Sequence, residues 1–178
     1  MRPEVDCALC PLSADRNAIV FADGDPSSPV VFVGEAPGEA EDRTGLPFVG
    51  RSGKILDALM EEEGLPRSKV LITNTVKCRP PGNRDPTASE MSACLPFLEY
   101  ELKGRKLIIG LGKSACRDLL HTDVKMKQVA NQRMRIHIAG KEIEFIPTYH
   151  PAACIYSREA RWALKETIRT VKEEFFTP

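Results

Sequence analysis

The chain has 178 residues, a formal net charge of zero, 42% hydrophobic residues and 28% charged residues. This length and composition are typical of one globular domain, which we expect to span residues 1–178. The neutral charge argues against a general nucleic-acid coat protein and confines any nucleic-acid surface to a local basic patch. No apolar run reaches the ~20 residues of a membrane span or resembles a signal peptide, so we expect a cytoplasmic protein that does not bind membranes.

Apolar runs without alternation predict strands that are covered on both faces. In chain order, strands are expected at residues 30–34, 70–74, 106–110 and 144–149. Helices are expected from Ser52, from Thr87 to Leu102, over residues 113–120 and over residues 160–175. Thr87 and Glu90 form a capping box, and residues 135–146 have the alternation of a β-hairpin. Strands that alternate with helices indicate a mostly parallel sheet between two helical layers.

Polar residues follow three of the predicted strands. Glu35 lies in a glycine-rich loop after the first strand, Asn74 ends the second, and His150 follows the last. Ligands of such folds bind beyond the carboxyl ends of the strands. We therefore expect these side chains at one edge of the sheet.

The six cysteines are interpreted as metal ligands or core residues, because disulfides are rare in a reducing compartment. Cys7 and Cys10 form a C-x2-C pair, and Cys78 and Cys94 could complete a set of four thiolates. Spacing alone leaves both a zinc ion and a [4Fe–4S] cluster open. For the remaining two cysteines we favour a packing role, and they are Cys116 and Cys154.

Two segments approach the phosphate-binding P-loop motif without matching it. The first has Arg51 where the motif requires lysine, and the second has Leu107 where it requires glycine. Nucleotide hydrolysis is therefore not expected.

Four segments together resemble the family 4 uracil-DNA glycosylases. They are Gly-Glu-Ala-Pro-Gly at 34–38 with Glu41-Asp42, Gly-Leu-Pro-Phe-Val-Gly-Arg-Ser-Gly at 45–53, the stretch from Asn74 to Pro86, and Pro-Thr-Tyr-His-Pro at 147–151. The resemblance extends from Cys7 to the last helix. It implies a three-layer α/β/α sandwich around a four-stranded, mainly parallel sheet. It also implies a structural [4Fe–4S] cluster held by the cysteines at positions matching the family motif, namely Cys7, Cys10, Cys78 and Cys94.

The implied reaction is hydrolysis of the N-glycosidic bond of uracil in DNA, which releases uracil and leaves an abasic site for base excision repair. The enzyme must stabilise negative charge on the departing base and supply a water. The Asn74 amide can donate to uracil O4 and accept from N3–H, whereas cytosine presents the reverse pattern. Phe48 can stack on the extruded base. The family position of His150 implies a hydrogen bond to uracil O2.

Two carboxylates, Glu41 and Glu35, are candidates for orienting or activating the water. We favour Glu41 for this role, with Glu35 contacting the base or the water. Ala36 is expected to line the base slot, where relatives outside the family carry the water-activating aspartate.

Basic residues around these loops are expected to contact uracil-containing DNA, on which the protein would act as a monomer. They are Arg51, Lys77, Arg79, Arg84 and Arg158. Residues Ile155 and Tyr156 match the family's intercalating loop in position.

Two alternatives remain open from the sequence. The base removed could be hypoxanthine or xanthine instead of uracil, or the chain could be a non-catalytic iron–sulfur module that binds DNA. The presence of Glu35, Glu41, Phe48, Asn74 and His150 argues against a non-catalytic module.

Overall fold

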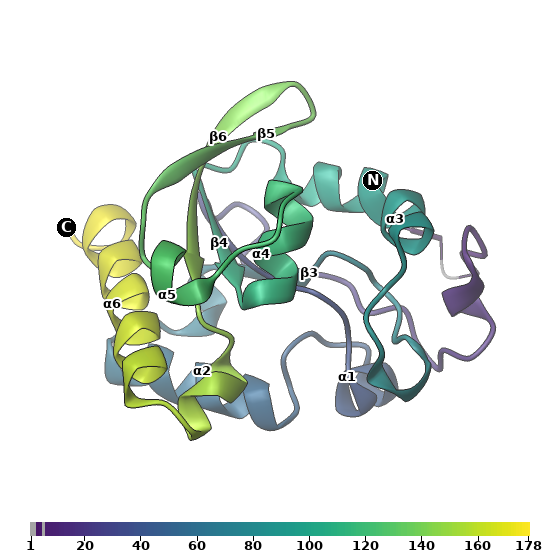
Figure 1. Cartoon of the computed structure of the whole chain (residues 1–178), viewed down its shortest axis with the longest axis horizontal. Helices are drawn as coiled ribbons and strands as arrows, with labels where there is room; N and C mark the ends of the chain where they lie inside the picture. Colours follow the sequence, from purple (N-terminus) through teal and green to yellow (C-terminus); the bar gives the residue numbers. More distant parts are fainter. Residues whose placement is uncertain (1–2, 5) are drawn as a thin grey trace.

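The computed structural model describes residues 3–4 and 6–178, which form a mixed sheet with helices on both faces (Figure 1). Within these residues, six strands pair in the order β1-β3-β2-β4-β6-β5. The strands are β1 (Asp23–Gly24), β2 (Val30–Gly34), β3 (Leu71–Asn74), β4 (Leu107–Leu111), β5 (Met134–Ile138) and β6 (Lys141–Thr148). The four central strands are parallel, and β1 and β5 pair antiparallel at the two edges.

Helices cover both faces of the sheet. They are α1 (Glu39–Thr44), α2 (Arg51–Glu62), α3 (Ala88–Leu102), α4 (Lys113–Leu120), α5 (Met126–Val129) and α6 (Arg158–Phe175), with short 3-10 turns η1 (Pro11–Ser13), η2 (Arg67–Lys69), η3 (Pro81–Asn83) and η4 (Pro151–Ile155). Apolar residues of α2 and α6 pack on one face, and those of α3 and α4 pack on the other. None of the helices in the described part of the chain is both long and apolar enough to span a bilayer.

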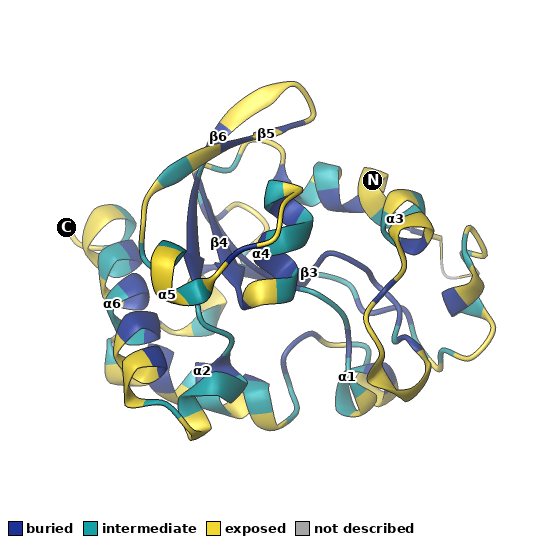
Figure 2. Cartoon of the chain, viewed as in Figure 1, coloured by how far each residue is buried: buried dark blue, intermediate teal, exposed yellow. Residues whose placement is uncertain are grey.

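Strands β2, β3 and β4 are buried throughout, whereas β6 begins with exposed residues at its Lys141 end (Figure 2). In β2, Val30 and Phe32 contact the layer of α2 and α6, whereas Val31 and Val33 contact the layer of α3 and α4. Successive side chains of a strand point to opposite faces, so both faces of a doubly covered strand are apolar. This burial explains the continuous apolar runs in the sequence.

The predicted strand count of four was wrong, although the four predicted parallel strands are present. Strand β1 has only two residues, so it produces no apolar pattern. Strand β5 belongs to the predicted hairpin, whose second arm and the last predicted strand are one continuous β6. The sheet therefore gains one antiparallel strand at each edge.

The capping box at the start of α3 is confirmed. Thr87 Oγ1 accepts from the Glu90 amide at 3.2 Å, and Glu90 Oε1 accepts from the Thr87 amide at 2.8 Å. The helix expected from Ser52 begins one residue earlier, at Arg51 after Gly50, so Ser52 lies within the first turn of α2.

Candidate active site

A cleft of about 340 Å³ lies at the carboxyl ends of the central strands. Six residues that the sequence analysis selected for base binding or catalysis line it, namely Glu35, Ala36, Glu41, Phe48, Asn74 and His150. The segment between β2 and α2, the end of β3 and the loop after β6 bring these residues together from distant parts of the chain. A cleft of this size suits a small planar ligand.

Gly34 allows the floor of the cleft to form. It ends β2 directly beside Asn74, the last residue of β3. A Cβ atom on Gly34 would lie 2.5 Å from Cζ of Phe48 and 2.6 Å from Oδ1 of Asn74. The missing side chain therefore leaves space for the aromatic ring and the amide to meet over the strand end.

The backbone of Phe48 is held in an unusual conformation. Its φ of 51° lies in the left-handed region, which a bulky residue rarely adopts. Arg67 donates from Nη1 to the Phe48 carbonyl and from Nη2 to the Pro47 carbonyl, both at 2.7 Å. A Cβ atom on Gly53 would lie 1.9 Å from the Phe48 carbonyl oxygen, so α2 approaches this loop closely. These contacts offset the backbone strain and fix the ring in the cleft.

Glu41 supports the same loop from the other side. Its Oε1 accepts from the Gly38 amide at 3.0 Å, and its Oε2 accepts from the amides of Val49 and Gly50 at 2.9 and 2.7 Å. Both carboxylate oxygens are thus occupied by the backbone. The role of water activator that we favoured for Glu41 stays a prediction, and the geometry shows that its carboxylate holds the loops before α1 and α2.

The His150 ring is oriented by its own backbone. Nδ1 accepts a hydrogen bond from the Ala152 amide at 3.1 Å, which places the proton of a neutral imidazole on Nε2. Burial lowers the pKa of His150 below its ordinary value, so the neutral form is favoured near pH 7. The ring centroid lies 6.0 Å from that of Phe48. His150 can therefore donate a hydrogen bond beside the aromatic surface.

Asn74 is 4% exposed, and among the described residues no group hydrogen-bonds its side-chain amide. Lys77 holds the strand end from behind, donating from Nζ to the Asn74 carbonyl and to Thr73 Oγ1, both at 2.7 Å, and pairing with Glu101. The predicted contact of Lys77 with DNA was wrong, because its side chain is only 1% exposed.

Glu35 is the remaining carboxylate of the cleft, and its surroundings were not anticipated. Burial, followed by the proximity of Asp118 and Asp85, raises the pKa of Glu35 from 4.5 to about 8. Arg117 Nη2 lies 3.1 Å from Glu35 Oε2. Arg117 and Asp118 lie within α4, which carries no matching motif, so no sequence pattern pointed to them.

Comparison with known proteins agrees with this geometry. Residues 21–172 match the model of the uracil DNA glycosylase superfamily. Proteins named type-4 uracil-DNA glycosylase are 39% identical in Sulfurisphaera tokodaii (98% of this chain, 82% of the relative) and 42% identical in Saccharolobus solfataricus (94% and 81%). One from Thermotoga maritima is 41% identical over 93% of this chain and 88% of its own length.

The chain belongs to the type-4 uracil-DNA glycosylases. The family expected from the sequence is thereby confirmed. Within the type-4 uracil-DNA glycosylase fold described here, the cleft occupies the ligand-binding edge that is usual for parallel α/β sheets.

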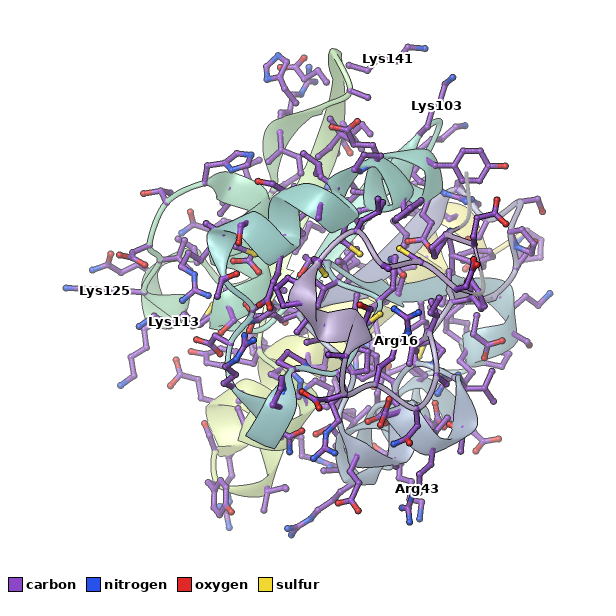
Figure 3. The ribbon with its side chains drawn as sticks, turned by 90° about the vertical axis from the view of Figure 1, so that its right-hand side faces the viewer. Arg16, Arg43, Lys103, Lys113, Lys125 and Lys141 are labelled. Carbon is purple, nitrogen blue, oxygen red and sulfur yellow. The ribbon has the colours of Figure 1, made fainter. Side chains whose placement is uncertain are left out.

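A second cavity of this type-4 protein is lined by four cysteines and Arg16. The cysteines are Cys7, Cys10, Cys78 and Cys94. Arg16 Nη1 lies 3.6 Å from Cys78 Sγ and donates to it. Figure 3 shows Arg16 in the middle of this face beside several sulfur atoms, whereas the labelled lysines extend outward at the rim. Burial raises the pKa of the Cys94 thiol to about 11.

The donor set of this cavity fits a thiolate-bound metal centre, because four thiols line one shared space. The other two cysteines pack in the main cores, with Cys116 fully buried and Cys154 partly buried.

The other basic residues predicted at the DNA surface of the type-4 protein differ in their positions. Arg51 and Arg158 are exposed first residues of α2 and α6, and Arg79 donates to Asn83 at 2.8 Å. Arg84 lines the cleft and pairs with Glu90 through two hydrogen bonds of 2.8 and 2.9 Å. In the loop after His150, Ile155 is 38% exposed and Tyr156 is 87% exposed.

Sequence reasoning missed three further residues that line the cleft, namely Asn83, Asp85 and Ser114. Asn83 has a φ of 58° and ends the turn signal Pro-Pro-Gly-Asn, which marks a loop but not a site. Ser114 lies in the first turn of α4, two residues after Gly112.

Proposed function

We propose that this protein hydrolyses the N-glycosidic bond of uracil in DNA. The observation that carries the proposal is the meeting of an unoccupied asparagine amide, an aromatic ring and a neutral histidine in one cleft of base size. Membership of a family whose relatives are named uracil-DNA glycosylases supports it. The products are free uracil and an abasic site.

The recognition roles follow from the hydrogen-bonding groups. The Asn74 amide would donate to uracil O4 and accept from N3–H, while Phe48 stacks on the ring. Cytosine would leave the buried amide mismatched, which disfavours it strongly. His150 Nε2–H would donate to uracil O2, where negative charge develops as the bond breaks. A neutral donor is sufficient for this task.

Glu35 replaces Glu41 as the proposed water-activating group. Its ionised carboxylate would accept a proton from the water that attacks C1′ and would face the positive charge of the sugar. A pKa near 8 makes it a strong enough base that is still partly ionised near neutral pH. Excision should therefore become faster as pH rises toward about 8.

The target base must leave the helix, which costs a few kcal/mol. Four arginines would hold the flanking phosphates, and they are Arg84 in the cleft together with Arg51, Arg79 and Arg158. The exposed Ile155 or Tyr156 would fill the gap that the base leaves. DNA binding is thus local, as the neutral net charge requires.

We also propose that the four-cysteine cavity holds a [4Fe–4S] cluster. When bound, the cluster cross-links parts of the chain and performs no step of base removal. Cys7 and Cys10 precede the sheet, Cys78 follows β3 and Cys94 lies in α3. The cluster would tie these segments to the strand that carries Asn74.

A cleavage assay tests the proposed function directly. Purified protein is incubated with duplexes that differ at one position, carrying uracil, hypoxanthine, xanthine or cytosine, and abasic sites are revealed by alkali. Release of uracil alone is expected. Preferred release of a purine would assign a different substrate, and DNA binding without release of any base would leave a non-catalytic module.

A further inference from the structure

The carboxyl group of Glu35 belongs to a small charged network that extends beyond the cleft lining. Arg117 of α4 lies 3.1 Å from Glu35 and also contacts Asp118 at 3.4 Å and Asp85 at 3.9 Å. The Glu35 side chain is 14% exposed and that of Asp118 is 5% exposed. Thr75 Oγ1 lies 2.8 Å from the Glu35 carbonyl and 3.4 Å from Asp118.

The charges of this network do not balance when all its groups are ionised. One guanidinium faces three carboxylates, of which two are largely removed from solvent. Buried carboxylates that lie together tend to share a proton, because repulsion opposes the second ionisation. The same cleft also exposes Glu35 to the charged or titratable groups of other elements, namely Glu41, Arg84 and His150.

We propose that Arg117 and Asp118 of α4 are positioning residues that control the orientation and the protonation of Glu35. The inference rests on the proposed function of Glu35 in uracil removal. Arg117 clamps one carboxylate oxygen and favours the ionised form, whereas Asp118 disfavours that form through its own negative charge. The two side chains therefore act on Glu35 in opposite directions.

Because Arg117 and Asp118 carry opposite charges, neutralising each of them should shift the pKa of Glu35 in opposite directions. Removing the cation in Arg117→Gln should raise the pKa of Glu35, and removing the anion in Asp118→Asn should lower it. A neighbouring charge within ~4–6 Å shifts a carboxyl pKa by about one unit or more. A residue with a merely structural role would reduce activity at every pH without moving the profile.

The experiment measures the rate of single-turnover excision of uracil from a duplex over a pH range of about 5.5 to 9.5. This range contains the expected titration of Glu35 and shifts of about one unit in either direction. The rising part of the pH–rate profile should shift to higher pH by about one unit in Arg117→Gln and to lower pH by about one unit in Asp118→Asn. Arg117→Lys keeps the cation and should return the profile to its wild-type position. Arg169→Gln removes a surface arginine that pairs with Glu63, and should leave the profile unchanged.

A second measurement follows the carboxyl group itself. The ¹³C shift of the Glu35 carboxyl, assigned by its loss in Glu35→Gln, reports its titration in the intact protein whether or not uracil is released. Opposite shifts of this titration in the two variants support the inference. Unmoved titrations, or shifts in the same direction, overturn it. Wild-type protein that releases no uracil would overturn the proposed function alone, since the titration still tests the network.

Discussion

Asn74 presents a side-chain amide without a hydrogen-bonding partner among the described residues, at a strand end that Lys77 fixes from behind. Such an amide makes little contribution to folding but is available for a ligand. Its neighbour Gly34 has a packing reason to be glycine, because any side chain there would occupy the position of the amide. At the residue scale, recognition therefore depends on one amide and on the space left beside it.

Replacing Asn74 by alanine should lower uracil excision by about 10²–10³-fold, the typical effect of removing one preorganised hydrogen-bonding group. The melting temperature should stay close to that of the wild type, because no described side chain binds the amide. Single-turnover kinetics and thermal unfolding measure the two quantities. Full activity in the variant would refute the recognition role.

Glu35 should make stability depend on pH. Its pKa rises from 4.5 to about 8 on folding, so the native protein retains a proton that the unfolded chain releases. The stability from this group is fully present below pH 4.5 and is lost as pH rises through about 8. As pH rises from 4.5 to about 8, the melting temperature of the wild type should fall relative to that of Glu35→Gln. Parallel melting curves of the two proteins would contradict the raised pKa.

At the scale of elements, local signals were predictable and long-range pairings were not. Thr87 and Glu90 lie three residues apart, so their capping box is visible in the sequence. Lys77 lies in a segment that resembles a basic loop, and its burial depends on its pairing with Glu101 of α3, which lies 24 residues away in the sequence. The three amides that occupy Glu41 come from two loops, which sequence spacing could not place together.

The loop between α1 and α2 depends on Arg67, which lies in η2 and binds two of its carbonyls. Arg67→Met keeps the apolar stem and removes both donors. We expect it to reduce excision about tenfold or more through displacement of Phe48, since small misplacements of a site are costly. Arg169→Met, which removes a surface ion pair between α6 and Glu63, is the matched control. Equal activity of the two variants would show that the loop holds Phe48 without Arg67.

Across the whole molecule, the parallel sheet and the family could be predicted because apolar runs and motif spacing extend along nearly the entire chain. The edge strands could not, since β1 has only two residues and is defined by its partner β3. The cleft at the carboxyl edge followed from the topology, and Asn74 and His150 are both found there. The charged partners of Glu35 required coordinates, because α4 has no matching motif.

The four-cysteine cavity connects the segment before β1 with the segment after β3 and with α3, so its metal content should govern the stability of the whole molecule. Cys78→Ala removes one expected cluster ligand, and we expect loss of iron, loss of visible absorption and a lower melting temperature. Cys154→Ala, which removes a partly buried thiol outside the cavity, should retain iron and unfold near the wild-type temperature. Iron and sulfide analysis, together with thermal unfolding, measures these properties in both variants.

The iron content of the wild type tests which metal centre is bound. About four iron atoms per chain are expected for a [4Fe–4S] cluster with about four thiolate ligands. Zinc in place of iron would overturn the cluster assignment, and equal iron in Cys78→Ala would exclude that cysteine as a ligand.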